Sequence, residues 1–296
     1  MSSNPIRLGF MGFGEAAQIF ASDFSQAGIT HLFAYSPSGA KALPGDPVQK
    51  KAQACGITLV KTPGALARHA DIIIALTAGK LALGAARKIT KSLRPHHFYI
   101  DASTNSATAM EKIAALIGDK AQFVDASIMG PVPVSRIKIP IVLSGREAEK
   151  VSALLNSLGM NTKVISPDPG AASAMKLIRS VCMKGLSGLL FESLEAAHRR
   201  GILDACVEDL SATFNDIAFE KIIKRFICGT ATHAPRRIHE MSESLELLDS
   251  AHGYSRLTRA TLSFMKDMAH SGLAEKFPQE HDSIEPVIKA WMQAHQ

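Results

Sequence analysis

The sequence has little of what several protein classes require. Its four cysteines are scattered and form no Cys-x-x-Cys pair, which argues against a metal or disulfide framework and is typical of a reducing cytoplasm. No run of about 18 apolar residues occurs, so we expect no membrane span. The stretch MSSNPIRLGFMGFG lacks the apolar core and cleavage site of a signal peptide, so we expect a cytoplasmic protein.

Aromatic side chains and clustered positive charge are also scarce. The chain has one Trp and three Tyr in 296 residues, which leaves few rings for stacking on nucleobases. Its net charge is +6, but the Lys and Arg residues are dispersed and form no dense basic run. We therefore expect neither a nucleic-acid partner nor a metal, and the charge favours a small anionic substrate.

The first part of the chain alternates short apolar segments with helical patterns. Residues 6–10 and 31–35 are predicted strands on either side of a predicted helix at 15–28. Residues 71–77 are nearly all apolar, as expected of a strand that is buried on both faces. Continued strand–helix alternation predicts an α/β fold of the Rossmann type, with a doubly wound parallel sheet.

The character of the sequence changes after residue 167. One long helix is predicted from Ala171 onward, followed by shorter helices that break near Gly229, Gly253 and Pro278. No convincing strand is found in this part. We therefore expect a dinucleotide-binding domain and an all-helical domain for substrate binding and dimerisation, with bounds 1–167 and 168–296.

A glycine-rich turn follows the first predicted strand. Its sequence, Gly12-Phe13-Gly14-Glu15-Ala16-Ala17, matches Gly-x-Gly-x-x-Gly/Ala between a strand and a helix. Gly12 permits the tight turn, and Gly14 lets a pyrophosphate approach the backbone at the helix N-terminus. A purely structural turn is the alternative. The predicted cofactor contacts in and beyond this turn are Gly12, Phe13, Gly14, Glu15, Ala16, Thr77 and Thr104.

The second predicted strand is followed by hydroxyl groups and a cation. NAD-specific sites carry an acidic residue at this position, but none occurs between Asp23 and Asp46. Ser36, Ser38 and Lys41 suit a ribose 2′-phosphate better than a free 2′-hydroxyl. This pattern favours NADP as the cofactor, with NAD possible, and a plain solvated turn as the alternative.

A narrow polar stripe runs along the long apolar helix. At about 100° per residue, its members fall within a sector of about 80°. They are Ser173, Lys176, Ser180, Lys184 and Ser187. A lysine partly buried in a cleft has a lowered pKa and can exchange a proton with a hydroxyl or carbonyl. Lys176 is therefore a candidate general acid–base, with a solvent-facing stripe as the alternative.

Four segments in order resemble those of the β-hydroxyacid dehydrogenase superfamily, which includes 6-phosphogluconate dehydrogenase and 3-hydroxyisobutyrate dehydrogenase. They are IRLGFMGFGEAA, IDASTNSA, FVDASIMGPVP and GAASAMKLIRS. The resemblance implies that Lys176 is the catalytic lysine, that residues 100–107 line the nicotinamide pocket and that residues 123–133 form the substrate loop. KGLSGLLFESLEAA and APRRIHEMSE resemble a branch with a helical C-terminal domain of unassigned function. Pairing of family members through their helical domains implies a homodimer.

Two positions depart from the main family. Met129 stands where the family has serine, and Ser180 stands where it has asparagine, so the family's substrates are not implied here. Arg236, in a cluster from His233 to Glu240, could grip an acidic substrate, or could simply pair with a glutamate on a surface helix. The predicted substrate contacts are Ser103, Met129, Gly130, Ser180, Lys184 and Arg236.

These observations together predict an NADP-preferring oxidoreductase for a small hydroxy acid. Lys176 would take the hydroxyl proton as hydride leaves for the cofactor, and would return it in the reduction. Gly130 would offer backbone N–H groups to the substrate carboxylate, while Lys184 would add a second cation or lie on the helix surface. Reduction of a C=N bond and a non-catalytic role as an NADP-binding regulator are the alternatives.

Overall fold

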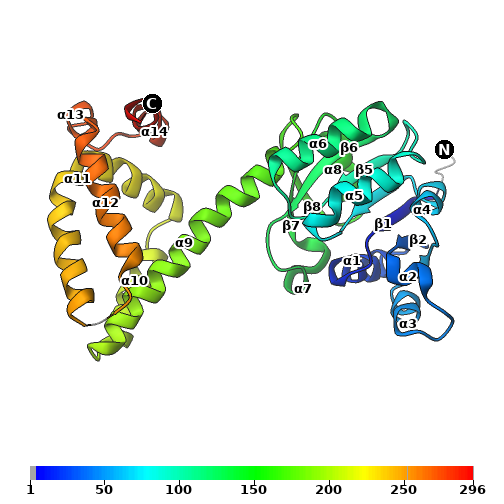
Figure 1. Cartoon of the computed structure of the whole chain (residues 1–296), viewed down its shortest axis with the longest axis horizontal. Helices are drawn as coiled ribbons and strands as arrows, with labels where there is room; N and C mark the ends of the chain where they lie inside the picture. The colour runs from blue at the N-terminus through cyan, green and yellow to red at the C-terminus, as the bar shows by residue number, and fades with distance from the viewer. Residues whose placement is uncertain (1–4, 252, 296) are drawn as a thin grey trace. The chain divides into compact units, whose positions relative to one another are not determined.

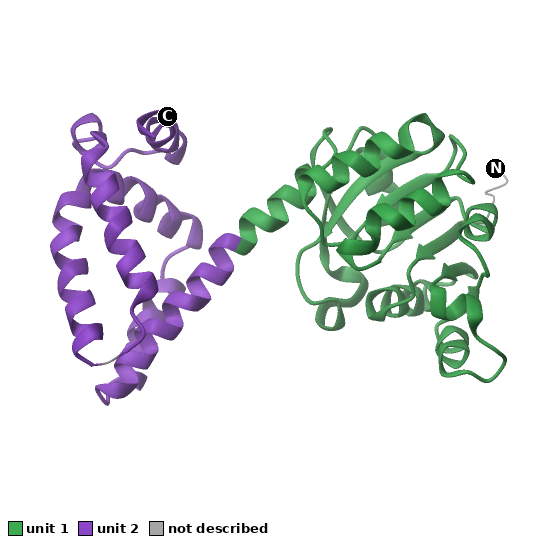
Figure 2. Ribbon diagram, in the orientation of Figure 1, with its two compact units in different colours: residues 1–180 green, residues 181–296 purple. Residues whose placement is uncertain are grey.

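The structure is a computed structural model that describes residues 5–251 and 253–295. The chain divides into two compact units, Met1–Ser180 (unit 1) and Val181–Gln296 (unit 2), coloured separately in Figure 2. None of the described helices combines the length and the apolar character that crossing a bilayer requires.

Unit 1 contains an eight-stranded sheet with the strand order β3-β2-β1-β4-β5-β6-β7-β8 (Figure 1). Its strands are β1 (Arg7–Met11), β2 (His31–Tyr35), β3 (Ile57–Leu59), β4 (Ile72–Ala75), β5 (Phe98–Asp101), β6 (Gln122–Ile128), β7 (Pro140–Ser144) and β8 (Asn161–Ser166). The expected α/β fold of the Rossmann type is confirmed.

Helices cover both faces of this sheet. They are α1 (Glu15–Gln26), α2 (Pro37–Lys41), α3 (Pro47–Ala54), α4 (Pro63–His69), α5 (Gly79–Thr90), α6 (Ala107–Ile117), α7 (Val132–Ser135) and α8 (Ala148–Ser157), with 3₁₀ turns at Gly118–Lys120 and Arg136–Lys138. One apolar core packs α1, α3 and α8 on the sheet, and a second packs α4, α5 and α6. The apolar runs of the central strands are buried because both faces are covered.

Two strands, β7 and β8, depart from the expected all-parallel sheet. β7 pairs antiparallel with β6, while β8 pairs parallel with β7. The connection between β6 and β7 covers residues 129–139 and contains only short helical turns among its described elements. Parallel strands need a crossover of about a dozen residues or more, usually an α-helix. This connection, which the structure describes in full, contains no helix long enough for such a crossover, and the chain returns in the opposite direction.

The long helix α9 (Ala171–Arg199) begins in unit 1 and continues into unit 2. The boundary between the compact units follows Ser180, thirteen residues after the sequence-based boundary at 167, because the first turns of α9 belong with the sheet. Figure 1 shows α9 as one continuous helix.

The described part of unit 2 is helical. Its further helices are α10 (Leu203–Asn215), α11 (Phe219–Ser250), α12 (Arg256–His270), α13 (Leu273–Lys276) and α14 (Ile284–Ala294). The expected break near Gly229 is wrong, because α11 runs through both Gly229 and Pro235. An added Cβ at Gly229 would lie 3.0 Å from Glu280 Oε1, so this glycine permits close packing rather than ending the helix.

Candidate functional site

Four strand residues lie in one row across the middle of the sheet. Met11 pairs with Ala75, Ala75 with Asp101, and Asp101 with Asp125. The neighbours β1 and β4 mark the point where the strand order reverses, since β2 and β3 lie on the other side of β1. Ligands of open α/β sheets bind outside the carboxyl ends of the strands at this switch point. The loops that follow β1, β4 and β5 are therefore the expected walls of the site.

The glycine turn has the geometry that a bound pyrophosphate needs. Gly12 has φ = +117°, and an added Cβ would lie 2.6 Å from the Leu76 carbonyl oxygen. Gly14 is the N-cap of α1, with no side-chain cap and no atom within 4 Å of an added Cβ. Side chains at these positions would strain the backbone at Gly12 and fill the open space at Gly14. The turn fits the predicted dinucleotide cofactor.

The remaining residues of the glycine turn divide by exposure. Phe13 is buried in the core between α1 and the sheet, whereas Glu15 is exposed and Ala16 half-buried in the first turn of α1. The backbone N–H groups of Glu15 and Ala16 belong to the N-terminus of α1, next to the open space at Gly14.

The turn after β2 presents hydroxyls and a cation, as the sequence predicts. Ser36 is buried, and its hydroxyl accepts a hydrogen bond from the Gly39 N–H as the N-cap of α2. Ser38 and Lys41 are exposed on the same short helix. The Ser36 hydroxyl thus shapes the turn, and Ser38 and Lys41 are the groups available to a ligand.

The loops after β4 and β5 are joined to each other. The Asn105 side chain donates to the Gly79 carbonyl at 2.8 Å, and an added Cβ at Gly79 would collide with the Thr104 carbonyl oxygen. The Thr77 hydroxyl oxygen is buried and has no hydrogen-bond partner among the described residues. An orphaned hydroxyl in this loop fits the prediction that Thr77 contacts the cofactor.

Lys176 reaches this pair of loops from the second turn of α9. Its Nζ donates to Thr104 Oγ1 at 2.9 Å, and both residues belong to unit 1. The side chain is half-buried, and burial lowers the pKa of the Lys176 amine because it disfavours the charged form. A lysine with a lowered pKa beside the loop of Thr104 can both accept and donate a proton.

Comparison with known proteins gives the family. The sequence pattern described as the NAD binding domain of 6-phosphogluconate dehydrogenase matches residues 7–166. The chain belongs to this family. It is an NAD(P)-dependent oxidoreductase of the hydroxyacid dehydrogenase type, as the resemblance of its four segments implied. A domain of unknown function, DUF1932, matches residues 197–268, which confirms the distinct C-terminal branch.

Individual relatives agree with this placement. An uncharacterized 28.5 kDa protein of Methanothermus fervidus is 28% identical over 238 residues, which is 80% of this chain and 89% of that protein. The conserved protein MTH1747, of unknown function and structurally similar to 3-hydroxyacid dehydrogenases, is 31% identical with a TM-score of 0.60, over 90% and 98% of the two chains. An imine reductase from Myxococcus stipitatus in complex with NADP+ is 18% identical with a TM-score of 0.73, over 96% and 99%, and this likeness shows the fold.

Two buried aspartates support the Lys176–Thr104 contact, and the sequence analysis did not single them out. Asp101 and Asp125 are both fully buried. Asp101 accepts a hydrogen bond from Ser103, next to Thr104, and Asp125 accepts one from Ser173, three residues before Lys176. Their signal in the sequence is an acidic residue in an otherwise apolar strand, within the segments YIDAS and FVDAS. A carboxylate in such a position requires partners, which makes it a candidate for a positioning role.

The predicted substrate contacts of unit 1 lie in different surroundings. Ser103 is buried, and both its N–H and its hydroxyl donate to Asp101. Met129 is half-buried and its N–H is already bonded to the Pro140 carbonyl, while Gly130 is exposed beyond the end of β6. Ser180 is half-buried on α9, one turn beyond Lys176.

The two predicted substrate contacts of unit 2 are on its surface. Lys184 is exposed on α9, and Arg236 is exposed on α11, where its Nε lies 3.8 Å from Glu240 Oε1. The Arg–Glu pair along one helix is the alternative arrangement that the sequence left open for this cluster. Its energetic value is small for exposed partners.

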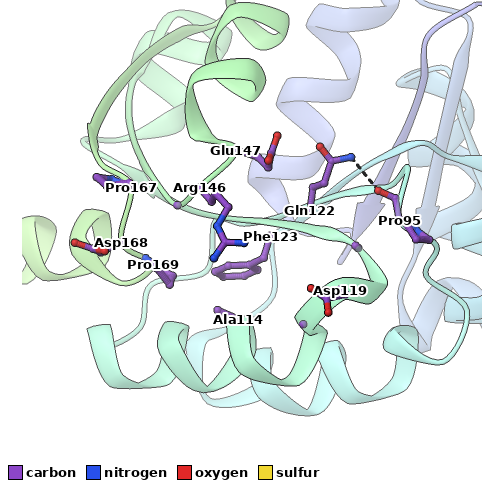
Figure 3. Close-up of a pocket in the computed structure, with 13 residues that line it drawn as sticks. Pro95, Ala114, Asp119, Gln122, Phe123, Arg146, Glu147, Pro167, Asp168 and Pro169 are labelled. Atoms are coloured by element: carbon purple, nitrogen blue, oxygen red, sulfur yellow. Dashed lines mark hydrogen bonds between the residues drawn. The ribbon is translucent and has the colours of Figure 1, made fainter.

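A cavity of about 550 Å³ lies elsewhere in unit 1, at the edge of the sheet where β6 begins. Figure 3 shows its lining, with Arg146 and Phe123 pointing into it and Asp119 and Asp168 at opposite sides. None of the predicted catalytic, cofactor or substrate residues is among the residues that line it. The cofactor site is therefore defined by the strand ends and the glycine turn, not by this cavity.

Proposed function

We propose that the protein is an NADP-preferring dehydrogenase that oxidises a small hydroxy acid and catalyses the reverse reduction. The observation that carries this proposal is the half-buried amine of Lys176, 2.9 Å from Thr104 at the carboxyl ends of the strands. A cofactor with its pyrophosphate at the Gly12–Gly14 turn and its nicotinamide near Ser103, Thr104 and Asn105 would accept or supply the hydride.

Lys176 supplies the proton chemistry in this proposal. With the pKa of its amine lowered by burial, a larger share of the side chain is neutral and able to accept the hydroxyl proton during oxidation. In the reduction, the ammonium form returns this proton to the carbonyl oxygen. Thr104 holds the amine in place through its hydroxyl. General acid–base catalysis of this kind contributes about 10²- to 10⁴-fold to a rate.

The NADP preference rests on the turn after β2. Ser38 and Lys41 are exposed there. The sequence has no acidic residue between Asp23 and Asp46, so no carboxylate in this segment repels a 2′-phosphate. An anionic substrate is in keeping with the net charge of +6.

We further propose a homodimer in which helix α9 takes part. Three large apolar side chains on this helix are strongly exposed, with relative accessibilities of 70% for Ile178, 76% for Val181 and 78% for Phe191. A second copy of the chain would bury them. Light scattering coupled to size exclusion should give twice the mass of one chain, and Phe191→Glu should halve that mass. A monomer at high protein concentration would contradict the dimer.

The experiment that tests the function is a substrate panel with both cofactors, followed by nicotinamide absorbance. It contains hydroxy acids, phosphorylated sugar acids and cyclic imines. The proposal predicts turnover of a hydroxy acid with NADP⁺ and its loss in Lys176→Ala. Turnover of imines alone would favour C=N reduction instead. Tight binding of NADPH without turnover of any compound would favour a non-catalytic regulator.

A further inference from the structure

Two buried aspartates occupy the same register on neighbouring parallel strands. Asp101 ends β5 and pairs directly with Asp125 of β6, and neither side chain is exposed to solvent. Burial raises the pKa of Asp101, and the neighbouring Asp125 raises it further, because two carboxylates this close disfavour each other's charged form. Such a costly arrangement is retained only where each carboxylate has specific partners.

The partners of Asp125 are in the first turn of α9. Asp125 Oδ2 accepts the Ser173 N–H at 3.0 Å, and Oδ1 accepts the Ser173 hydroxyl at 2.8 Å. The Ser144 hydroxyl donates to Oδ2 at 3.2 Å and accepts the Ala172 N–H at 2.9 Å. Two N–H groups that a helix leaves unpaired at its N-terminus are thus bonded by side chains of β6 and β7. The negative charge also lies at the positive end of the helix dipole.

The partners of Asp101 are in the loop that carries Thr104. Asp101 Oδ1 accepts the Ser103 N–H at 3.0 Å and the Ser103 hydroxyl at 2.6 Å. On the other side of Thr104, the Asn105 side chain bonds the Gly79 carbonyl at 2.8 Å. The loop is therefore held on both sides of the residue that accepts the hydrogen bond of Lys176.

We propose that Asp101 and Asp125 are a pair of positioning residues that together set the distance between Lys176 and Thr104. Asp125 fixes the first turn of α9, three residues before Lys176, and Asp101 fixes the turn directly before Thr104. The two aspartates lie on adjacent strands of the same sheet. The start of α9 and the loop of Thr104 are therefore both anchored to this sheet, which fixes their separation. This inference rests on the proposed role of Lys176 as the proton carrier. A misplacement of about 1 Å in such a site can reduce a rate by about 10²-fold.

The test compares Asp125→Asn with a matched control at the other end of the same helix. The introduced asparagine keeps one oxygen for the Ser173 N–H but removes the negative charge at the N-terminus of α9, so the bonds that hold the first turn become weaker. Glu192, also buried and also bonded to a helix N-terminus through the N–H groups of Leu257 and Thr258, serves as the control in Glu192→Gln. Ser173→Ala removes one bond to Asp125 and retains the carboxylate, so it covers the case in which Asp125→Asn does not fold.

Two measurements are made on each variant: steady-state kinetics, and the rate at which an amine-reactive reagent acylates Lys176 as a function of pH, read by mass spectrometry. For Asp125→Asn we expect kcat to fall 10- to 100-fold with the cofactor dissociation constant within about twofold, because only the proton carrier is displaced. We expect the acylation profile to shift to higher pH, as the amine loses its buried position. Ser173→Ala should show both effects more weakly, and Glu192→Gln should show neither.

The outcomes separate this inference from the proposed function. Wild-type kcat and a wild-type acylation profile in Asp125→Asn would overturn the positioning role, even if Lys176→Ala abolishes turnover. Equal losses in Asp125→Asn and Glu192→Gln would also overturn it, because a general loss of helix stability would then explain both. If no substrate is turned over, a shifted acylation profile in Asp125→Asn alone still supports the positioning role, whereas the proposed reaction fails.

Discussion

Near each end of helix α9, a buried carboxylate accepts hydrogen bonds from the N–H groups at the start of a helix, but the surroundings differ. Near its start, Asp125 of β6 accepts backbone and hydroxyl bonds from Ser173. Near its other end, Glu192 of α9 accepts the N–H groups of Leu257 and Thr258 in the first turn of α12. Both carboxylates are buried, and both compensate for the free N–H groups of a helix N-terminus.

The two ends differ in the residues that come after the bonded turn. Three residues after Ser173, the half-buried amine of Lys176 meets the Thr104 hydroxyl in a loop of the cofactor site. The first turn of α12 instead carries Arg259, whose guanidinium pairs with the exposed carboxylate of Asp249 at 2.8 Å, and this turn belongs to the domain of unknown function. A buried carboxylate that caps a helix therefore does not by itself indicate a catalytic site. Its role depends on which side chains follow in the helix turn that it caps.

The largest expected effect comes from removing the amine. Lys176→Ala should lower kcat by about 10²-fold or more, since the proton carrier is lost, and leave the cofactor dissociation constant nearly unchanged. Arg179→Ala is the matched control, because Arg179 is exposed on the same part of α9. Steady-state kinetics and cofactor titration measure both quantities. A loss of equal size in the two variants would remove Lys176 from the mechanism.

The second effect concerns the pH dependence of stability. Burial raises the pKa of Asp101 to about 6, whereas the unfolded chain releases this proton near the ordinary value of 3.8. The folded form therefore binds the proton more tightly, and its free energy of unfolding falls as the pH rises from about 4 to about 6. The fall is on the order of 3 kcal/mol.

Asp101→Asn tests this contribution, because asparagine keeps an acceptor for Ser103 and does not titrate. Denaturant unfolding of both proteins at pH 4 and pH 6.5 measures the change. We expect the wild type to lose stability relative to Asp101→Asn over this range. A constant difference between the two proteins would show that Asp101 titrates alike in the folded and unfolded states.

The third effect is a loss of folding stability, without a loss of cofactor binding, when the carboxylate near the C-terminal end of α9 is removed. Glu192→Ala leaves the N–H groups of Leu257 and Thr258 without their acceptor, which costs about 1–3 kcal/mol for buried groups. Chemical denaturation should show this loss, while the dissociation constant of NADPH at a temperature where the protein is folded should stay unchanged. Weakened NADPH binding would mean that Glu192 also serves the nucleotide site.

The smallest effect is on the choice of cofactor. Ser36→Asp places a carboxylate at the end of β2 and keeps the N-cap of α2, because aspartate caps helices as well as serine does. We expect the ratio of NADP to NAD affinity to fall about tenfold, which corresponds to about 1.4 kcal/mol. Lys41→Ala should weaken NADP binding and leave NAD binding unchanged. A wild type that already prefers NAD would contradict the assignment.

Much of unit 1 can be predicted from local patterns in the sequence. Short apolar strands, amphipathic helices and the glycine turn are set by neighbours within a few residues, so the strand β1, the helix α1 and the turn at Gly12 and Gly14 were predictable. The polar stripe identified Lys176, because helical periodicity alone places it on one face with Ser173. The structure divides this stripe, since Ser173 is buried and Lys184 exposed.

The features that could not be predicted depend on tertiary contacts. The antiparallel direction of β7 results from a short connection, but its consequence, the approach of Ser144 to Asp125, requires the sheet order. The pairing of Asp101 with Asp125 depends on register between strands, which no local pattern states. At Gly229, packing against Glu280 outweighs the weak helix propensity of glycine, so α11 continues.

The most direct test of the central claim is the pKa of the Lys176 amine, measured from the pH dependence of its acylation with and without NADP⁺. We expect a value below about 10.4, the ordinary value for lysine, and slower acylation once NADP⁺ is bound. An ordinary lysine pKa and a rate that NADP⁺ does not change would contradict the proposed role of Lys176.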